Sequence, residues 1–281
     1  MLLFLFPNLS IGFCSRKLVL GPDPFRKPFT RGWAMEMRTD IVAARGQIQG
    51  GMQTLPYQPM VVVTTAVFSF DGAKLRLLAV RKGHDEPSSY FLPSLPFDFS
   101  EDLTATARQV IRSRLPLDLS PVFQVGAFEG VAEKEKEETK KLEICYFTIA
   151  SPSDLEFVAT SGIEQYRFLE VHEQADLLEP HSREIALAAL AELRRRTRFE
   201  TIAFAFLAHE FSLSELQRVF EAILNRPMDV RNFRKKIESL DILKESPHRP
   251  RGMAYRPPRM FSFEAERFQH RQTLEGEVRF Y

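Results

Sequence analysis

The hydrophobic pattern of this 281-residue chain changes near residue 180, and that change limits the folds that the chain can adopt. Before this point the apolar residues come in short β-branched runs, of which 61–70 (VVVTTAVFSF) is the clearest. Runs of this kind, bounded by turn residues, are typical of β-strands. After residue 180 the apolar residues recur every three or four positions, as on one face of an amphipathic helix. The pattern therefore predicts an α+β domain over 60–180, followed by a mostly helical domain over 181–268 and a tail over 269–281.

The first predicted domain consists of five strands and one helix. The strands are expected over 61–70, 75–81, 122–128, 142–150 and 166–171. Asp71-Gly72 lies between the first two strands and is typical of a hairpin turn. Ser100-Glu101-Asp102 is expected to cap a helix that runs to about residue 114. The Glu- and Lys-rich stretch 129–143 predicts a solvated loop or hairpin tip.

Residues 1–59 show no lasting helical or strand period, and we interpret them as a disordered extension. The apolar run 1–14 lacks a basic segment and is shorter than the roughly 20 residues that span a bilayer. No membrane segment is therefore predicted. Several later methionines leave open whether this extension belongs to the natural protein: Met35, Met37, Met52 and Met60.

The second predicted domain contains a helix-turn-helix. Helices are expected over 182–196, 199–208, from Ser212 to about 224, and over 230–240. Ser212 and Glu215 have the spacing of a capping box, in which each residue caps the other's backbone N–H. The stretch 225–228 breaks the third helix, and Asp229 caps the fourth. Two helices joined by a tight turn, the second rich in cations, are typical of a DNA-binding helix-turn-helix.

The fourth helix has the pattern of a recognition helix. Its predicted buried stripe consists of Val230, Phe233, Ile237 and Leu240. The outward face then carries Arg231, Asn232, Arg234 and Lys235, which are predicted to contact DNA. Arginine and asparagine suit hydrogen bonds to base edges, and lysine suits phosphates. After this helix, two short strands around a basic Pro- and Gly-rich tip predict a wing, whose DNA contacts would be Arg249, Arg251, Arg256 and Arg259.

The charge distribution supports this interpretation, although the total charge does not. The chain has 38 Lys and Arg against 37 Asp and Glu, a net charge of +1. Residues 225–260 carry ten basic and four acidic groups, whereas 61–224 carry 18 basic and 26 acidic groups. An acidic body repels DNA and leaves the basic helix and wing as the surface that can approach it. A solvated helical face, or a winged helix that docks another protein, is the alternative.

The segment Tyr90-Phe91-Leu92-Pro93 ahead of the first helix resembles the Nudix fold. That resemblance implies a catalytic box with glutamates that bind Mg²⁺. Glu101 stands at the first glutamate of the box, but the other signature residues are replaced by Ser94-Leu95, Gln109-Val110, Ser113-Arg114 and Pro116. Residues 103–114 contain three arginines and no acidic residue. We therefore predict no catalytic residue, no metal and no hydrolase activity for this domain.

A Nudix-like domain without catalysis can still bind a ligand. The resemblance places Arg81 near the ligand pocket, although an exposed arginine at a strand end is an equal alternative. Tyr90 and Phe91 are predicted to stack on a base, and Phe68 is assigned to the core. The loop His84-Asp85-Glu86 is expected to face solvent. The two cysteines give no disulfide framework and favour a cytoplasmic protein, with Cys145 buried in a strand.

Taken together, residues 60–263 resemble the Nudix-related transcriptional regulators of bacterial NAD metabolism. The stretches that carry this resemblance are 211–237, 181–185 and 256–263. It implies a homodimeric repressor of NAD biosynthesis or salvage genes that binds a double-stranded DNA operator, with a dinucleotide such as NAD or ADP-ribose as effector and no bound cofactor. The alternative is a Nudix pyrophosphohydrolase acting on ADP-ribose or a related nucleoside diphosphate.

Overall fold

The structure is a computed structural model, and it describes residues 60–81, 90–113, 121–134, 137–160, 165–247 and 258–281, together with residues 115, 117 and 119. The predicted extension over 1–59 and the loop at 84–86 lie outside these residues. Residues 58–281 form one compact unit.

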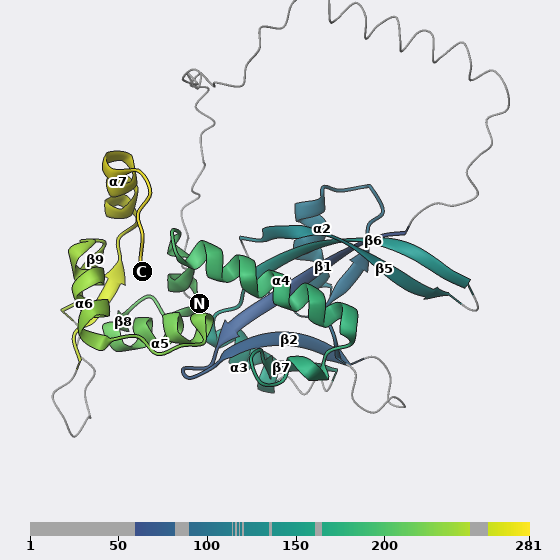
Figure 1. Cartoon of the computed structure of the whole chain (residues 1–281), viewed down its shortest axis with the longest axis horizontal. Coiled ribbons are helices and arrows are strands. Elements are labelled where there is room, and N and C mark those ends of the chain that lie inside the picture. The colour runs from purple at the N-terminus through teal and green to yellow at the C-terminus, as the bar shows by residue number, and fades with distance from the viewer. Residues whose placement is uncertain are drawn as a thin grey trace, which may run out of the picture. The chain divides into compact units, whose positions relative to one another are not determined.

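A seven-stranded mixed sheet forms the first part of this unit (Figure 1). Its strands are β1 (Met60–Phe70), β2 (Leu75–Arg81), β3 (Tyr90–Phe91), β4 (Ser94–Pro96), β5 (Phe123–Lys134), β6 (Glu137–Ile149) and β7 (Tyr166–Glu170). The main order is β3-β2-β1-β6-β5, with β4 paired to β1 and β7 paired to β2. Strands β1 and β6 are parallel, and the other pairs are antiparallel. The predicted α+β class is confirmed.

The two faces of the sheet are covered by different helices because side chains alternate along β1. Val63 and Val67 pack in one cluster with helix α2 (Leu103–Arg112) and helix α3 (Pro152–Thr160). Ala66 and Phe68 point to the other face, which is covered by helix α4 (Pro180–Thr197). Phe68 is fully buried, which confirms its assignment to the core.

Of the two alternatives predicted for 129–143, the hairpin is confirmed and the loop is not. Strands β5 and β6 continue through this stretch as a hairpin, with Gly130 opposite Lys141 and Lys134 opposite Glu137. A two-stranded ribbon tolerates charged side chains because backbone hydrogen bonds hold it together. Helix α3 and the short strands β3 and β4 had not been predicted.

The second part of the unit is a winged helix. It contains the 3-10 helix η2 (Thr201–Phe206), where an α-helix over 199–208 had been predicted, and the helices α5 (Leu213–Leu224) and α6 (Val230–Ser239). A small sheet in the order β8-β10-β9 joins β8 (Phe211–Ser212), β9 (Leu243–Glu245) and β10 (Met260–Phe263). The last helix is α7 (Ala265–Glu275).

The structure differs from the prediction of a tail over 269–281. Helix α7 extends to Glu275, and beyond it Phe280 is only 1% exposed. The Phe280 ring contacts those of Phe204, Phe220 and Phe268 at centroid distances of 5.9–6.0 Å. The residues between Phe268 and Phe280 are mostly polar, so the sequence does not reveal that these two rings pack together.

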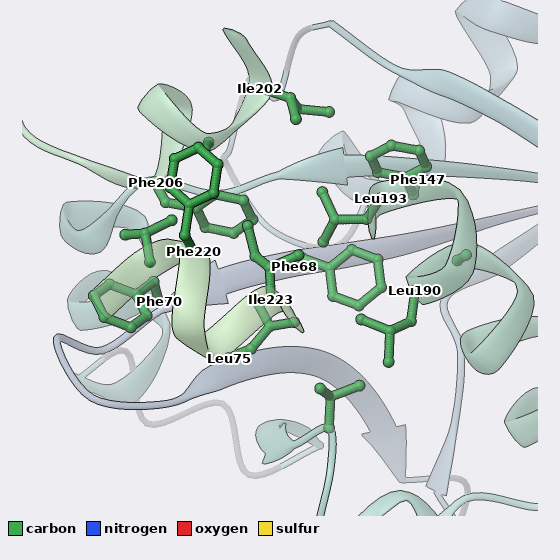
Figure 2. Close-up of a cluster of buried hydrophobic side chains, with 14 of the residues drawn as sticks. Phe68, Phe70, Leu75, Phe147, Leu190, Leu193, Ile202, Phe206, Phe220 and Ile223 are labelled. Atoms are coloured by element: carbon green, nitrogen blue, oxygen red, sulfur yellow. The ribbon is translucent and has the colours of Figure 1, made fainter. Parts of the chain in front are cut away.

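One hydrophobic cluster runs from the sheet into the winged helix (Figure 2). Phe68, Phe70 and Leu75 of the sheet belong to the same cluster as Phe220 and Ile223 of α5. Helix α4, assigned from sequence to the second domain, also contacts β1, β5 and β6. The two parts therefore share their core.

Candidate functional site

Helix α6 presents the predicted DNA-binding face. Phe233 and Ile237 are buried, and the Phe233 ring packs edge-on against Phe220 of α5 at 5.4 Å. This packing turns the opposite face outward, and all four predicted contact residues are exposed: Arg231, Asn232, Arg234 and Lys235. The Asp229 carboxylate caps the helix by accepting a hydrogen bond from the backbone N–H of Asn232 at 2.7 Å.

Two residues of α6 correct the sequence prediction. Val230 had been placed in the buried stripe but is 49% exposed. It occupies the first position of α6, ahead of the buried residues Phe233 and Ile237. Lys236 is also exposed and had been missed as a further cation of the outer face. Among the described residues, the side chains of Arg231, Lys235 and Lys236 form no ion pair.

The turn before α6 is held by side chains of α5. Asn225 ends α5 in the left-handed conformation, with φ +52°. The Glu221 carboxylate accepts a hydrogen bond from the N–H of Met228 at 2.8 Å, and the Gln217 amide donates to the Met228 carbonyl at 3.2 Å. At the other end of α5, Ser212 and Glu215 form a capping box, which confirms the prediction. These contacts fix the start of the recognition helix.

The wing is described at its base but not at its tip. Arg259 is exposed and lies 3.5 Å from the Glu245 carboxylate on the neighbouring strand. The other three predicted wing contacts, Arg249, Arg251 and Arg256, lie outside the described residues.

Helix α7 supports the C-terminal end of α6, a role that sequence reasoning missed. Arg271 donates through Nη1 to the carbonyl oxygens of Ser239 and Leu240, at 2.9 and 2.7 Å. Arg267 forms an ion pair of 3.0 Å with Asp241 just after α6. A cation at a helix C-terminus interacts favourably with the helix dipole. In the sequence, only the basic residues of an otherwise polar helix hint at this arrangement.

The three predicted effector residues lie close together, but not on one face of the sheet. Arg81 pairs in register with Tyr90, and Val80 pairs with Phe91. Tyr90 packs on the cluster covered by α4. Because successive residues of a strand point to opposite faces, Phe91 points away from Tyr90. The two aromatic rings therefore cannot stack together on one base.

Helix α2, which the resemblance compares with the Nudix catalytic helix, carries no acidic side chain. Asp102, just before it, caps the helix by accepting from the N–H of Ala105 at 2.7 Å. Val110, which the resemblance aligns with a glutamate of the box, is buried in the core. Among the described residues, no group of three or more His, Cys, Asp or Glu side chains is placed to hold a metal ion.

A buried carboxylate joins the sheet to the start of α4. Glu143 on β6 is 4% exposed and accepts hydrogen bonds from the Thr64 hydroxyl and from Lys141 Nζ at 2.7 Å. His181 Nε2 of α4 lies 3.1 Å from the same carboxylate. Burial alone would raise the pKa of Glu143, but the hydrogen bonds from Lys141 and Thr64 outweigh it and lower the pKa. Gly130 makes room for this cluster, since a Cβ there would meet Lys141 at 2.5 Å and His181 at 2.9 Å.

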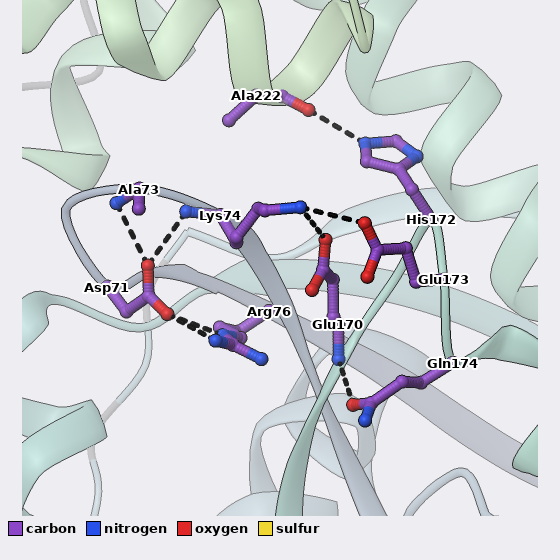
Figure 3. A network of polar contacts seen from close by, with 9 residues as sticks. All are labelled: Asp71, Ala73, Lys74, Arg76, Glu170, His172, Glu173, Gln174 and Ala222. Carbon is purple, nitrogen blue, oxygen red and sulfur yellow. Dashed lines mark hydrogen bonds and ion pairs between the residues drawn. The ribbon is translucent and has the colours of Figure 1, made fainter.

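Three polar contacts join α5 to the first part of the unit and to α4. His172 Nε2 lies 2.8 Å from the Ala222 carbonyl oxygen, and Arg194 Nε donates to that of Ile223 at 2.8 Å. The third contact runs from Arg218 Nη1 to the Gly72 carbonyl oxygen, at 2.8 Å. Figure 3 shows the neighbouring network, in which Lys74 bridges two glutamates and His172 reaches α5. Burial lowers the pKa of His172 more than the contact with the carbonyl raises it.

Comparisons with known proteins match both parts of the chain. Residues 203–263 match the family model of the NrtR DNA-binding winged helix domain. A protein of Acinetobacter baylyi described as an ADPR responsive transcriptional repressor NtrR is 24% identical over 208 residues, which cover 73% of this chain and 82% of that protein.

The solved structures show the same fold. NrtR of Shewanella oneidensis, crystallised with a 27mer DNA, superposes with a TM-score of 0.62 at 18% identity, over 74% of this chain and 95% of that one. A MutT/nudix family protein from Enterococcus faecalis gives a TM-score of 0.57 at 15% identity, over 80% of this chain and 98% of that one.

These likenesses define the class of protein. The chain has the fold of the Nudix-related regulators, a Nudix-like sheet followed by a C-terminal winged helix, which confirms the predicted fold class, and its residues 203–263 match a DNA-binding domain. Within that class it is similar to the NrtR regulators. In the described part of the chain, no helix is both long and apolar enough to cross a membrane.

Proposed function

We propose that this protein is a cytoplasmic, homodimeric repressor of NAD biosynthesis or salvage genes whose DNA binding is regulated by ADP-ribose or NAD. The observation that carries the proposal is the outer face of α6, where exposed cations lie on a helix that is packed and capped as a recognition helix. The ADPR-responsive description of the Acinetobacter baylyi relative supports ADP-ribose as the first effector to test.

On DNA, we assign different roles to the two sides of the α6 face. Arg231 and Asn232 lie in the first turn, which enters the major groove in helix-turn-helix proteins, and are proposed to contact base edges. Exposed Val230 beside them suits a thymine methyl group. Arg234 and Lys235 are proposed to contact phosphates. The same role is proposed for the wing arginines: Arg249, Arg251, Arg256 and Arg259.

For the effector, we propose a site at the paired ends of β2 and β3. Arg81 is exposed there and suits a phosphate, while Tyr90 offers a ring on the same face. Phe91 lies on the opposite face and is proposed to shape the other side of this edge. We further propose that the domain does not hydrolyse its ligand, because α2 supplies cations where a Nudix hydrolase needs carboxylates for Mg²⁺.

In a homodimer the effector needs only to bind one arrangement of the two winged helices more tightly than another. Two recognition helices read half-sites about 34 Å apart, so a small change in their spacing alters DNA affinity.

A gel-shift assay tests the proposal. The full-length protein is titrated against double-stranded DNA from upstream of its own gene, and the titration is repeated with ADP-ribose and with NAD. We expect binding that competitor DNA of unrelated sequence does not remove, and a dissociation constant that one dinucleotide changes at least five-fold. Binding that is indifferent to sequence and to both dinucleotides would refute the sensor.

The hydrolase alternative is tested by incubating the protein with ADP-ribose and Mg²⁺ and measuring AMP. We expect no AMP above the level without protein. A protein-docking winged helix is tested by the salt dependence of DNA binding, since phosphate contacts make the affinity fall steeply with salt. An affinity that does not change with salt would favour docking to a protein.

A further inference from the structure

The outer face of α5 contacts two other parts of the molecule. Ser214 and Arg218 are exposed and four residues apart, so they lie next to each other on this helix. The Ser214 hydroxyl accepts a hydrogen bond from Arg234 Nη2 of the recognition helix at 3.1 Å. Arg218 Nη1 donates to the Gly72 carbonyl oxygen in the turn between β1 and β2. One helix face therefore touches both the DNA-reading helix and the sheet.

The β1–β2 turn holds this carbonyl in a fixed position. Gly72 has a φ of +93°, which an L-residue rarely adopts. The neighbouring Asp71 carboxylate accepts the N–H groups of Ala73 and Lys74, at 2.9 and 2.7 Å, and pairs with Arg76 at 2.6 Å (Figure 3). The turn thus moves as one piece with β2.

Strand β2 connects the turn to the proposed effector site. Arg81 is its last residue, and at about 3.3 Å per residue it lies roughly 20 Å from the first residue, Leu75. Because β2 is hydrogen-bonded to β1, β3 and β7, a displacement at the Arg81 end is shared with these strands and not absorbed within β2. The end that carries Gly72 would then move against α5.

We propose that Arg218 is the positioning residue that couples effector binding to the recognition helix, by docking on the Gly72 carbonyl. The inference rests on the proposed function, since it requires an effector at the sheet. The contacts of His172 and Arg194 hold the C-terminal end of α5 and act as its pivot. The Arg218 contact is exposed, so it exchanges readily with water. The buried face of α5 stays packed in the shared core, and loss of the contact shifts the exposed face, where Ser214 holds Arg234.

The test compares wild-type protein with Arg218→Ala and with the matched control Arg195→Ala. Arg195 is also an exposed arginine, but it pairs with Glu192 on its own helix. Affinity for the upstream DNA is measured with and without ADP-ribose, and the ratio of the two dissociation constants is the coupling factor. Coupling factors are typically 5- to 150-fold.

We expect the coupling factor of Arg218→Ala to fall to within two-fold of one, and that of Arg195→Ala to stay at the wild-type value. The affinity of DNA-free protein for ADP-ribose, measured by calorimetry, should change less than two-fold in both variants. Arg218→Lys, which can still donate to the carbonyl, should keep part of the coupling.

A second variant changes Gly72, the residue whose carbonyl oxygen accepts the hydrogen bond from Arg218. In Gly72→Ala the added Cβ meets no atom within 4 Å, so its effect comes from the backbone, which cannot easily keep φ at +93°. We expect the same loss of coupling, with little further loss in the Arg218→Ala/Gly72→Ala double variant because both act on one contact.

The outcomes separate this inference from the proposed function. A wild-type protein that binds DNA but does not respond to ADP-ribose or NAD refutes the sensing function, and the inference with it. A wild-type protein that responds, together with an Arg218→Ala variant of equal coupling, refutes the inference alone. A third outcome is that Arg218→Ala weakens DNA binding by the same factor with and without ADP-ribose, and that the slope of log affinity against log salt concentration falls by about one. Arg218 would then be only a phosphate contact.

Discussion

Replacing Phe280 by alanine should strongly destabilise this protein, although the residue is next to the end of the chain. The side chain is 1% exposed and packs against three other phenylalanine rings. Truncating a buried phenylalanine costs about 3–5 kcal/mol, because the transfer free energy is lost and a cavity remains. The whole unit is expected to have an unfolding free energy of about 5–15 kcal/mol, so this is a large share.

Urea denaturation followed by circular dichroism measures this free energy on the full chain, and a thermal melt followed in the same way gives the melting temperature. At about 2–4 °C per kcal/mol for a unit of this size, the melting temperature should fall by roughly 6–20 °C. The control is Phe99→Ala, which removes a ring that is 73% exposed and should cost less than about 1 kcal/mol. If Phe280→Ala and Phe99→Ala lose similar stability, the packing of the C-terminal segment described above is incorrect.

Three further predictions concern DNA contact, pH and packing. Arg231→Ala should weaken operator binding by about 1–3 kcal/mol in a gel shift, whereas Arg195→Ala should not; equal affinities would remove α6 as the reading helix. Since the pKa of His172 is lowered in the folded state, its contribution to stability is present above its unfolded pKa of about 6.5 and is lost as the pH falls below that value. Between pH 7 and 5, the unfolding free energy should therefore fall more steeply in wild type than in His172→Gln, and parallel pH curves would contradict this. Gly130→Ala should cost about 1–3 kcal/mol by crowding the buried carboxylate cluster, and Gly126→Ala, whose Cβ meets its nearest neighbour at 3.8 Å, should cost less in the same denaturation assay.

Helix α6 and its exposed face could be predicted from sequence because that face is set by local periodicity. Phe233 and Ile237 recur at helical spacing, and the cations between them turn outward wherever that stripe is buried. Val230 shows the limit of this reasoning. Periodicity assigned it to the buried stripe, but whether a first-turn residue is covered depends on where the neighbouring helix lies.

The contacts that join the sheet to the winged helix could not be predicted in this way. Arg218 and Gly72 are 146 positions apart, and no sequence pattern links one to the other. The β5–β6 hairpin was predicted only as one of two alternatives, for a related reason. Its charged residues resemble those of a loop, and only the pairing of its two strands shows that they form a ladder.

Because one apolar core extends from the sheet into the winged helix, dividing the chain near residue 180 should not give two fragments that fold independently. A fragment that starts there would carry Leu190 and Leu193 without the sheet that buries them, and the remaining sheet would expose Phe68 and Phe147. Exposed patches of this kind cause aggregation. In a chimera that exchanges the DNA-reading part, α4 and η2 should therefore remain with the sheet, and the incoming α5 should keep Phe220 and Ile223, which complete the same core.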